Sequence, residues 1–209
     1  MTAFHPRLDD AGKPVAILRP STASPPAAWN DPDAIVTVPP GGAMPAELHG
    51  VPFVPWSPTD DDWWNAEAAR QPVVEPPWHC PEGKAAAAGI AIVEPDGRLW
   101  LAQPSNGFGG VAHVVPKGRR HDAGSLAAAA LREAWEEVGL LVRVTGHLID
   151  LPRSMTFTRY FIGRRIGGSP AAMHWESQGA VLCPIARLHE LLTGAHDAPL
   201  VAAILVHLG

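Results

Sequence analysis

The chain has 209 residues, of which 46% are hydrophobic and 18% are charged, so its composition excludes a protein that is disordered throughout. The formal net charge of -5 argues against an affinity based on neutralising nucleic-acid phosphates, and we expect no DNA partner. Cys80 and Cys183 are the only cysteines and show no CxxC spacing, which excludes a disulfide framework and a zinc knuckle. Without a secretory leader or an apolar run of about 18 residues, we expect a cytoplasmic protein with no membrane partner.

Residues 1–83, the N-terminal extension, have an unusual composition. Before Lys84 lie 16 of the 23 prolines and five of the eight tryptophans. Proline fixes φ and removes a hydrogen-bond donor, so we expect only short edge strands within Asp33–Val38 and Gly50–Trp56, and one short helix ending at Arg70. Five tryptophans on a free arm would expose a large apolar surface. We therefore expect the extension to be docked on the domain formed by residues 84–209 and to close one side of its cleft.

From Lys84 onward, strand and helix signals alternate and predict an α/β (α+β) domain. Strands are expected at Ala87–Glu94, Leu99–Gln103, Val111–Val115, Leu140–Leu151, Met155–Ile166 and Gln178–Cys183, with a hairpin turn at residues 95–97. Helices are expected at Ser125–Val138, Pro184–Leu192 and Ala198–Leu208. This order predicts a mixed sheet between the first of these helices and the two C-terminal ones.

The helix predicted at Ser125–Val138 carries an acidic face. At 100° per residue, Glu133, Glu136 and Glu137 lie on one side together with Arg132, opposite an apolar side. Such carboxylates repel each other unless a cation intervenes, and Mg²⁺ prefers oxygen ligands of this kind. Arg132, one turn before Glu136, is placed to hold that carboxylate. An acidic face that is merely solvated is the alternative explanation.

The residues around this helix belong to a longer motif. Pro116-Lys117-Gly118 is followed, fourteen residues after Gly118, by the sequence Arg-Glu-Ala-Trp-Glu-Glu-Val-Gly-Leu at positions 132–140. This pattern resembles the signature of the Nudix hydrolase family, Gly-x5-Glu-x7-Arg-Glu-U-x-Glu-Glu-x-Gly-U, in which U is a bulky aliphatic residue. Ala134 is a mild departure. The resemblance covers the motif and, more loosely, residues 84–208, and it implies an α/β/α sandwich; it says nothing about the extension.

One departure from the signature is serious. The first Glu should follow Gly118 by six residues, where this chain has Gly124. By resemblance, that carboxylate supports the loop and the helix start more than it binds metal, so its loss affects the loop geometry first. Asp122 is either a substitute or an ordinary turn residue. Ser125 is a suitable N-cap for the helix.

The resemblance implies hydrolysis of a nucleoside diphosphate linked to another moiety X, by attack of water on one phosphorus of the diphosphate bridge. It implies Mg²⁺ as the cofactor, with Mn²⁺ as an alternative, and Glu133 and Glu137 as its first ligands. Glu136 would be shared between metal binding and base catalysis, and the Gly118 carbonyl would complete the inner shell. Glu176, in a predicted loop, is a second candidate for the general base or an ordinary exposed residue.

The substrate is less defined. Pro116-Lys117-Gly118 in place of a Gly-Gly doublet resembles the branch that cleaves dinucleoside polyphosphates or diphosphoinositol phosphates. The cations available for a polyphosphate, each of which could equally be a solvated surface residue, are Lys117, Arg119, Arg120, Arg153 and Arg159. The partner is thus a nucleotide-derived small molecule, and a homodimer is an open option. The rival function is a non-catalytic Nudix-like module that binds a nucleotide or ADP-ribose, which the missing Glu keeps open.

Overall fold

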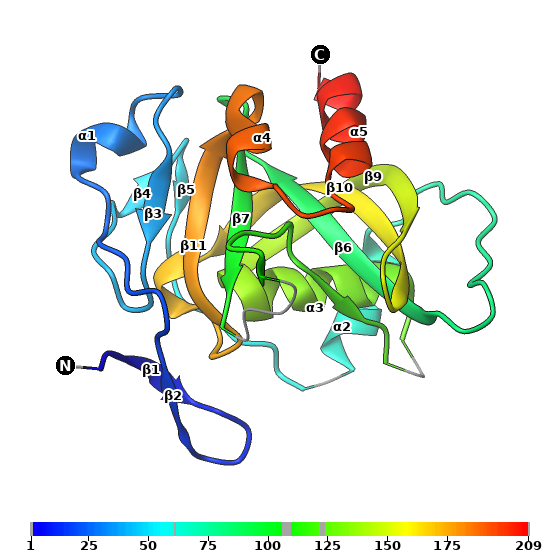
Figure 1. The fold of residues 1–209 in the computed structure, drawn as a ribbon, viewed down its shortest axis with the longest axis horizontal. Coiled ribbons are helices and arrows are strands. Elements are labelled where there is room, and N and C mark those ends of the chain that lie inside the picture. Colours follow the sequence, from blue (N-terminus) through cyan, green and yellow to red (C-terminus); the bar gives the residue numbers. More distant parts are fainter. Residues whose placement is uncertain (1, 61, 106–109, 122–123, 209) are drawn as a thin grey trace.

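The computed structural model describes residues 2–60, 62–105, 110–121 and 124–208 (Figure 1). Its strands are β1 (Phe4–Leu8), β2 (Pro14–Ala16), β3 (Val36–Val38), β4 (Glu47–Leu48), β5 (Val51–Pro52), β6 (Ala85–Val93), β7 (Arg98–Pro104), β8 (Lys117–Arg119), β9 (Leu140–Pro152), β10 (Thr156–Gly168) and β11 (Ser177–Pro184). Its α-helices are α1 (Pro26–Trp29), α2 (Trp63–Arg70), α3 (Leu126–Val138), α4 (Leu188–Leu191) and α5 (Ala198–Leu208). No helix within these described ranges is long and apolar enough to cross a membrane.

The main sheet is mixed. Its strand order is β3-β11-β7-β6-β10-β9, with β8 paired to β6 beside this path. β6 runs parallel to β10, whereas the other pairs are antiparallel. The turn between β6 and β7 uses Gly97 at a φ of 80°, which accounts for the predicted hairpin at this position.

Alternating side chains of the sheet supply two apolar layers. The face towards α3 carries Ile90, Ile92, Trp100, Ala102, Phe161, Ala180 and Leu182. The opposite face carries Ala91, Leu99, Leu101, Tyr160, Val181 and Cys183, and packs against Leu188, Leu192, Leu200 and Ile204 of the C-terminal segment. This period of two buries both faces of the sheet. The predicted sandwich, with α3 on one side and the C-terminal helices on the other, is confirmed.

Helix α3 begins and ends where its sequence predicts. The Ser125 hydroxyl accepts a hydrogen bond from the Ala128 backbone N–H at 3.0 Å, as an N-cap does. Gly139 follows the last turn at a φ of 68°, a left-handed conformation that glycine adopts without strain. These two ends fix the register of the acidic residues between them.

Two predictions of secondary structure were wrong. Val111–Val115 forms no strand: Val114 exchanges two backbone hydrogen bonds with Ala102, and the ladder stops before Pro116, which has no N–H. Strand β8 starts immediately afterwards and pairs with β6 instead. The helix predicted at Pro184–Leu192 is also interrupted, because Pro184 is extended and completes β11. A 3₁₀ turn at Ile185–Arg187 then leads into the short α4.

The extension contacts the main domain at several places. β3 pairs with β11 at the edge of the main sheet, and α2 lies next to α3 (Figure 1). The buried guanidinium of Arg98 donates to the backbone carbonyls of Ala28, Trp29 and Asp31, at 3.2, 2.6 and 3.2 Å. We propose from these contacts that residues 1–83 and the domain from residue 84 fold as one unit.

Candidate active site

A cavity of about 730 Å³ gathers most of the site residues expected from the sequence. Among the expected residues that line it are Lys117, Gly118, Arg119, Arg132, Glu133, Glu137 and Glu176, whereas Glu136 does not line it. They come from β8, from α3 and from the segment before β11, which the sheet topology brings to one place. No described residue of the extension belongs to this lining, so the extension does not itself form a wall of the cavity.

Arg132 organises two of the helix carboxylates. Its guanidinium forms ion pairs with Glu133, at 2.5 Å, and with Glu136, one turn further along α3. It also donates to the Arg119 backbone carbonyl at 2.9 Å. Arg132 therefore joins the acidic face of α3 to the end of β8, and the spacing of four residues to Glu136 produces the pairing expected from the sequence.

Two further contacts set the positions of Glu137 and Glu133. Glu137 accepts a hydrogen bond from the Lys117 backbone N–H at 2.9 Å. The Glu133 carboxylate lies directly against Gly118, so that a Cβ atom at this position would come within 2.1 Å of Glu133 Oε1. Glycine is thus required at position 118 because no side chain fits between β8 and the carboxylate.

The helix carboxylates are buried, and this raises their pKa values. Burial raises the pKa of Glu133 to about 8, and the adjacent Glu137 carboxylate adds to the shift. Burial raises the pKa of Glu136 to about 8, against the opposing effect of Arg132. Burial raises the pKa of Glu137 to about 7, although Lys117 partly offsets it. Burial therefore favours the protonated forms of these carboxylates when no cation is bound.

These residues have the chemistry of a site for a hard divalent cation. Carboxylate oxygens are the ligands that Mg²⁺ and Mn²⁺ prefer, and a bound cation would favour the charged forms of these groups, which burial disfavours. Within the described ranges, no three His, Cys, Asp or Glu side chains already form a metal cluster. Arg132 instead neutralises Glu133 and Glu136, so ion binding by these two groups requires this arginine to share or release them.

Glu176 is an acidic residue of the cavity that lies outside α3. It precedes β11, and burial raises its pKa. The Glu176 backbone carbonyl accepts from the Ser105 N–H at 2.8 Å, and the neighbouring His174 N–H donates to the Glu136 carbonyl at 2.9 Å. The loop of Glu176 is thereby tied to the end of α3, which places both candidate general bases in one region.

The expected role of Arg159 in substrate binding was wrong. Its side chain is 2% exposed and does not line the cavity. It instead forms two hydrogen bonds of 2.8 Å with Asp150 and one of 2.7 Å with Glu75 of the extension. A guanidinium neutralised by two carboxylates has little charge left for a phosphate, so Arg159 attaches the extension to β9 and β10.

Arg159→Ala is therefore expected to affect stability rather than substrate affinity. It removes the Arg159 ion pairs of Glu75 and Asp150 and leaves Asp150 with only His147, at 3.1 Å. We expect the free energy of unfolding to fall by about 2 to 3 kcal/mol, somewhat below the usual cost because both acids are partly exposed. Denaturant unfolding and KM measurements check this expectation, with Arg164→Ala on the exposed side of β10 as the control. A large rise in KM without loss of stability would contradict the assignment.

Sequence reasoning missed part of the cavity lining. Arg153, which the sequence presents only as one of several candidate cations, lines the cavity. Its guanidinium donates to Asp197 and to the Tyr160 hydroxyl, both at 2.7 Å. His196 and Thr158 also contribute to the lining. These residues lie in loops and strand ends without a local motif, so only the pairing of β6 with β10 and the return of the chain into α5 reveal them.

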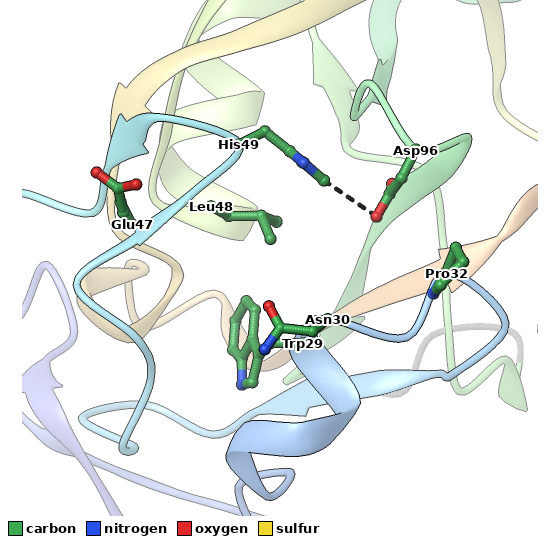
Figure 2. A pocket seen from close by; sticks show the side chains of 7 residues that line it. All are labelled: Trp29, Asn30, Pro32, Glu47, Leu48, His49 and Asp96. Carbon is green, nitrogen blue, oxygen red and sulfur yellow. Dashed lines mark ion pairs between the residues drawn. The ribbon is translucent and has the colours of Figure 1, made fainter.

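A second pocket, of about 410 Å³, lies between the extension and the turn from β6 to β7 (Figure 2). His49 and Asp96 face each other there, with His49 Nε2 3.0 Å from the Asp96 carboxylate. Asp96 also pairs with the buried Arg98 at 2.6 Å, and Arg98 together with His49 lowers its pKa. Asp96 is thus already neutralised, and Glu47, the other carboxylate of this lining, is exposed, so the pocket holds no group of buried carboxylates comparable to the acidic face of α3.

The chain is similar to known proteins in sequence and in fold. A family model described as the NUDIX domain matches residues 83–203. The fold is similar to an ADP-ribose pyrophosphatase from Streptococcus suis, at 20% identity over 59% of this chain and 90% of that chain, with a TM-score of 0.49. It is also similar to an Ap4A hydrolase from C. elegans, at 17% identity over 59% and 97% of the two chains, with a TM-score of 0.47. No curated protein matches the chain in sequence.

Proposed function

Because the chain belongs to the Nudix family of pyrophosphohydrolases, we propose that it uses Mg²⁺, with Mn²⁺ as an alternative, to hydrolyse a diphosphate bond in a nucleotide-derived small molecule. The observation that carries this proposal is the meeting of Glu133, Glu137 and Glu176 with Lys117 and Arg132 in one cavity. Its volume of about 730 Å³ is within the range of small-molecule sites.

In this mechanism the acidic groups of the cavity have separate tasks. Glu133, Glu137 and the Gly118 carbonyl would hold the divalent cation, which supplies charge neutralisation on the diphosphate and lowers the pKa of water. Lys117 and Arg119 would bind non-bridging phosphate oxygens and orient the bridge. Glu176 of the cavity, or Glu136 of α3, which does not line the cavity, would accept the proton of the attacking water. The raised pKa of each brings it closer to neutral pH, where a general base works best.

The substrate class follows from the balance of charge along the cavity. Lys117 and Arg119 flank Gly118 on β8 and line the cavity, so the lining offers two cations to a chain of phosphates. Arg153 also lines the cavity, but Asp197 pairs with its guanidinium at 2.7 Å. We propose a dinucleoside polyphosphate or a related polyphosphate as the substrate. The known Ap4A hydrolase and ADP-ribose pyrophosphatase with a similar fold supply two of the compounds to test.

Phosphate release from a substrate panel tests the function. The purified chain is incubated with dinucleoside polyphosphates, ADP-ribose, nucleotide sugars and diphosphoinositol phosphates, with Mg²⁺ or EDTA, and phosphatase is added for products that are phosphomonoesters. We expect turnover of at least one compound that EDTA abolishes and Glu137→Gln removes. Turnover that survives EDTA would contradict the metal-dependent mechanism.

A non-catalytic nucleotide or ADP-ribose module is the second candidate function. The observation that favours it is Gly124, which stands where the family signature has a carboxylate. Tight nucleotide binding without turnover of any compound in the panel would establish this function instead. Retention of Arg132 and three helix glutamates, which binding alone does not require, favours catalysis.

A homodimer stays a prediction.

A further inference from the structure

The junction between β8 and α3 is supported by a residue of the extension. The Ser125 backbone N–H, at the N-cap of α3, donates to the Asn65 side-chain oxygen at 3.2 Å. Ser125 uses its own hydroxyl to cap Ala128, and the first turn of α3 contains no acidic residue. Asn65 therefore satisfies a backbone donor that the residues around Ser125 leave open.

Asn65 occupies the space beside Gly124. A Cβ atom at Gly124 would lie 3.8 Å from Asn65 Oδ1, at van der Waals distance, and 3.5 Å from the His121 carbonyl. The side-chain amide thus lies within contact distance of the place where a side chain at position 124 would begin. The contact is made across 59 positions of sequence, by a residue of α2 rather than by the loop itself.

Helix α2 is held firmly enough to serve as a support. Trp63 and Trp64 pack with Trp56 and Trp135, with ring centroids 4.9 to 5.9 Å apart in the pairs Trp56–Trp63, Trp56–Trp64 and Trp64–Trp135. Trp135, on α3, also donates its indole N–H to the Trp56 carbonyl at 3.0 Å. At the other end of α2, the Gln71 side chain accepts from the Val144 N–H on β9 at 2.7 Å.

A displacement of this junction would reach the acidic site. The Glu133 carboxylate of α3 has no spare room against Gly118 of β8. Arg132 bridges the same two elements through the Arg119 carbonyl. A change in the start of α3 by a fraction of an ångström is thus transmitted to the groups that bind the cation and orient the bridge.

We propose that Asn65 is a positioning residue of the active site: its side-chain oxygen, presented by α2, fixes the backbone at Gly124 and Ser125 and so sets α3 against β8. The proposal rests on the proposed hydrolytic function only for its effect on turnover. It makes the N-terminal extension part of the catalytic unit although the extension does not line the cavity.

Asn65→Ala and Asn65→Asp test the role of the side-chain oxygen in the full chain. We expect Asn65→Ala to increase amide hydrogen exchange at Ser125 by roughly three- to tenfold, the range for loss of one hydrogen bond, and to lower kcat by a similar factor. KM should change much less. Asn65→Asp keeps the oxygen and should retain both the exchange protection and kcat.

Arg70→Ala, at the exposed end of α2, is the matched control and should leave both readouts unchanged. Unchanged exchange and kcat in Asn65→Ala would overturn the proposal, as would equal losses in Asn65→Asp. A fall in melting temperature with unchanged kcat would show a merely structural contact and would also overturn it. If the wild-type chain has no turnover, the hydrolytic function fails, while the exchange measurement still decides whether Asn65 fixes the start of α3.

Discussion

Glu137→Gln and Glu136→Gln are each expected to lower turnover by at least about a hundredfold while the fold keeps its stability. Loss of a charge-stabilising or base contribution in the transition state commonly has an effect of this size. Gln preserves the shape of each side chain, and at position 137 it can still accept the Lys117 N–H. The change therefore removes the charge without removing the packing.

The pH dependence of stability gives this prediction a second readout. The pKa values of Glu136 and Glu137 are raised on folding from 4.5 to about 8 and about 7. Their contribution to stability is thus fully present below pH 4.5 and is lost as the pH rises through 7 to 8. For the metal-free protein at pH 8, we expect the melting temperature of the Gln variants to equal or exceed that of the wild type.

Steady-state kinetics on a confirmed substrate and thermal unfolding at pH 5 and pH 8 check both parts. Glu190→Gln is the control, since Glu190 is exposed and pairs with Arg187 away from the cavity. Turnover close to wild type in both helix variants would remove α3 from the mechanism. A lower melting temperature of the variants at pH 8 would show that the carboxylates stabilise the fold instead of repelling each other.

Local sequence signals predicted the part of the site that lies on one helix. The spacing of Arg132, Glu133, Glu136 and Glu137 follows from the helical period, and the ends of α3 follow from Ser125 and Gly139, so no tertiary information was needed. The order of strand and helix signals likewise predicted a mixed sheet between α3 and the C-terminal helices. These features depend on neighbours only a few residues apart.

The errors concern contacts between distant segments. Nothing in the sequence around Arg159 indicates that Asp150 and Glu75 neutralise it. These residues meet only when β9, β10 and the extension are assembled. Val111–Val115 contains residues that favour strands, yet whether the segment forms a strand depends on which neighbouring strand has a free edge to pair with. Asp122, considered from the sequence as either a substitute for the missing Glu or an ordinary turn residue, lies outside the described residues. Asn65 could not be suspected without the packing of α2.

Gly118→Ala is expected to reduce kcat by about ten- to a hundredfold through a change of one methyl group. The added Cβ would lie 2.1 Å from Glu133 Oε1, so the carboxylate must move. Because the carboxylate is the end of a flexible side chain, the fold survives, but Glu133 leaves the position in which Arg132 holds it at 2.5 Å. Misplacement of a catalytic group by about 1 Å commonly has an effect of this size.

Gly167→Ala is the matched control for this substitution. Gly167 lies in β10, and its added Cβ would meet only Leu141 at ordinary contact distances of 3.7 and 3.8 Å. We expect this variant to keep wild-type kcat, whereas Gly118→Ala also needs more Mg²⁺ for half-maximal activity because a ligand is displaced. Wild-type activity and wild-type Mg²⁺ dependence in Gly118→Ala would mean that Glu133 works from another position, and its assignment as a metal ligand would then fail.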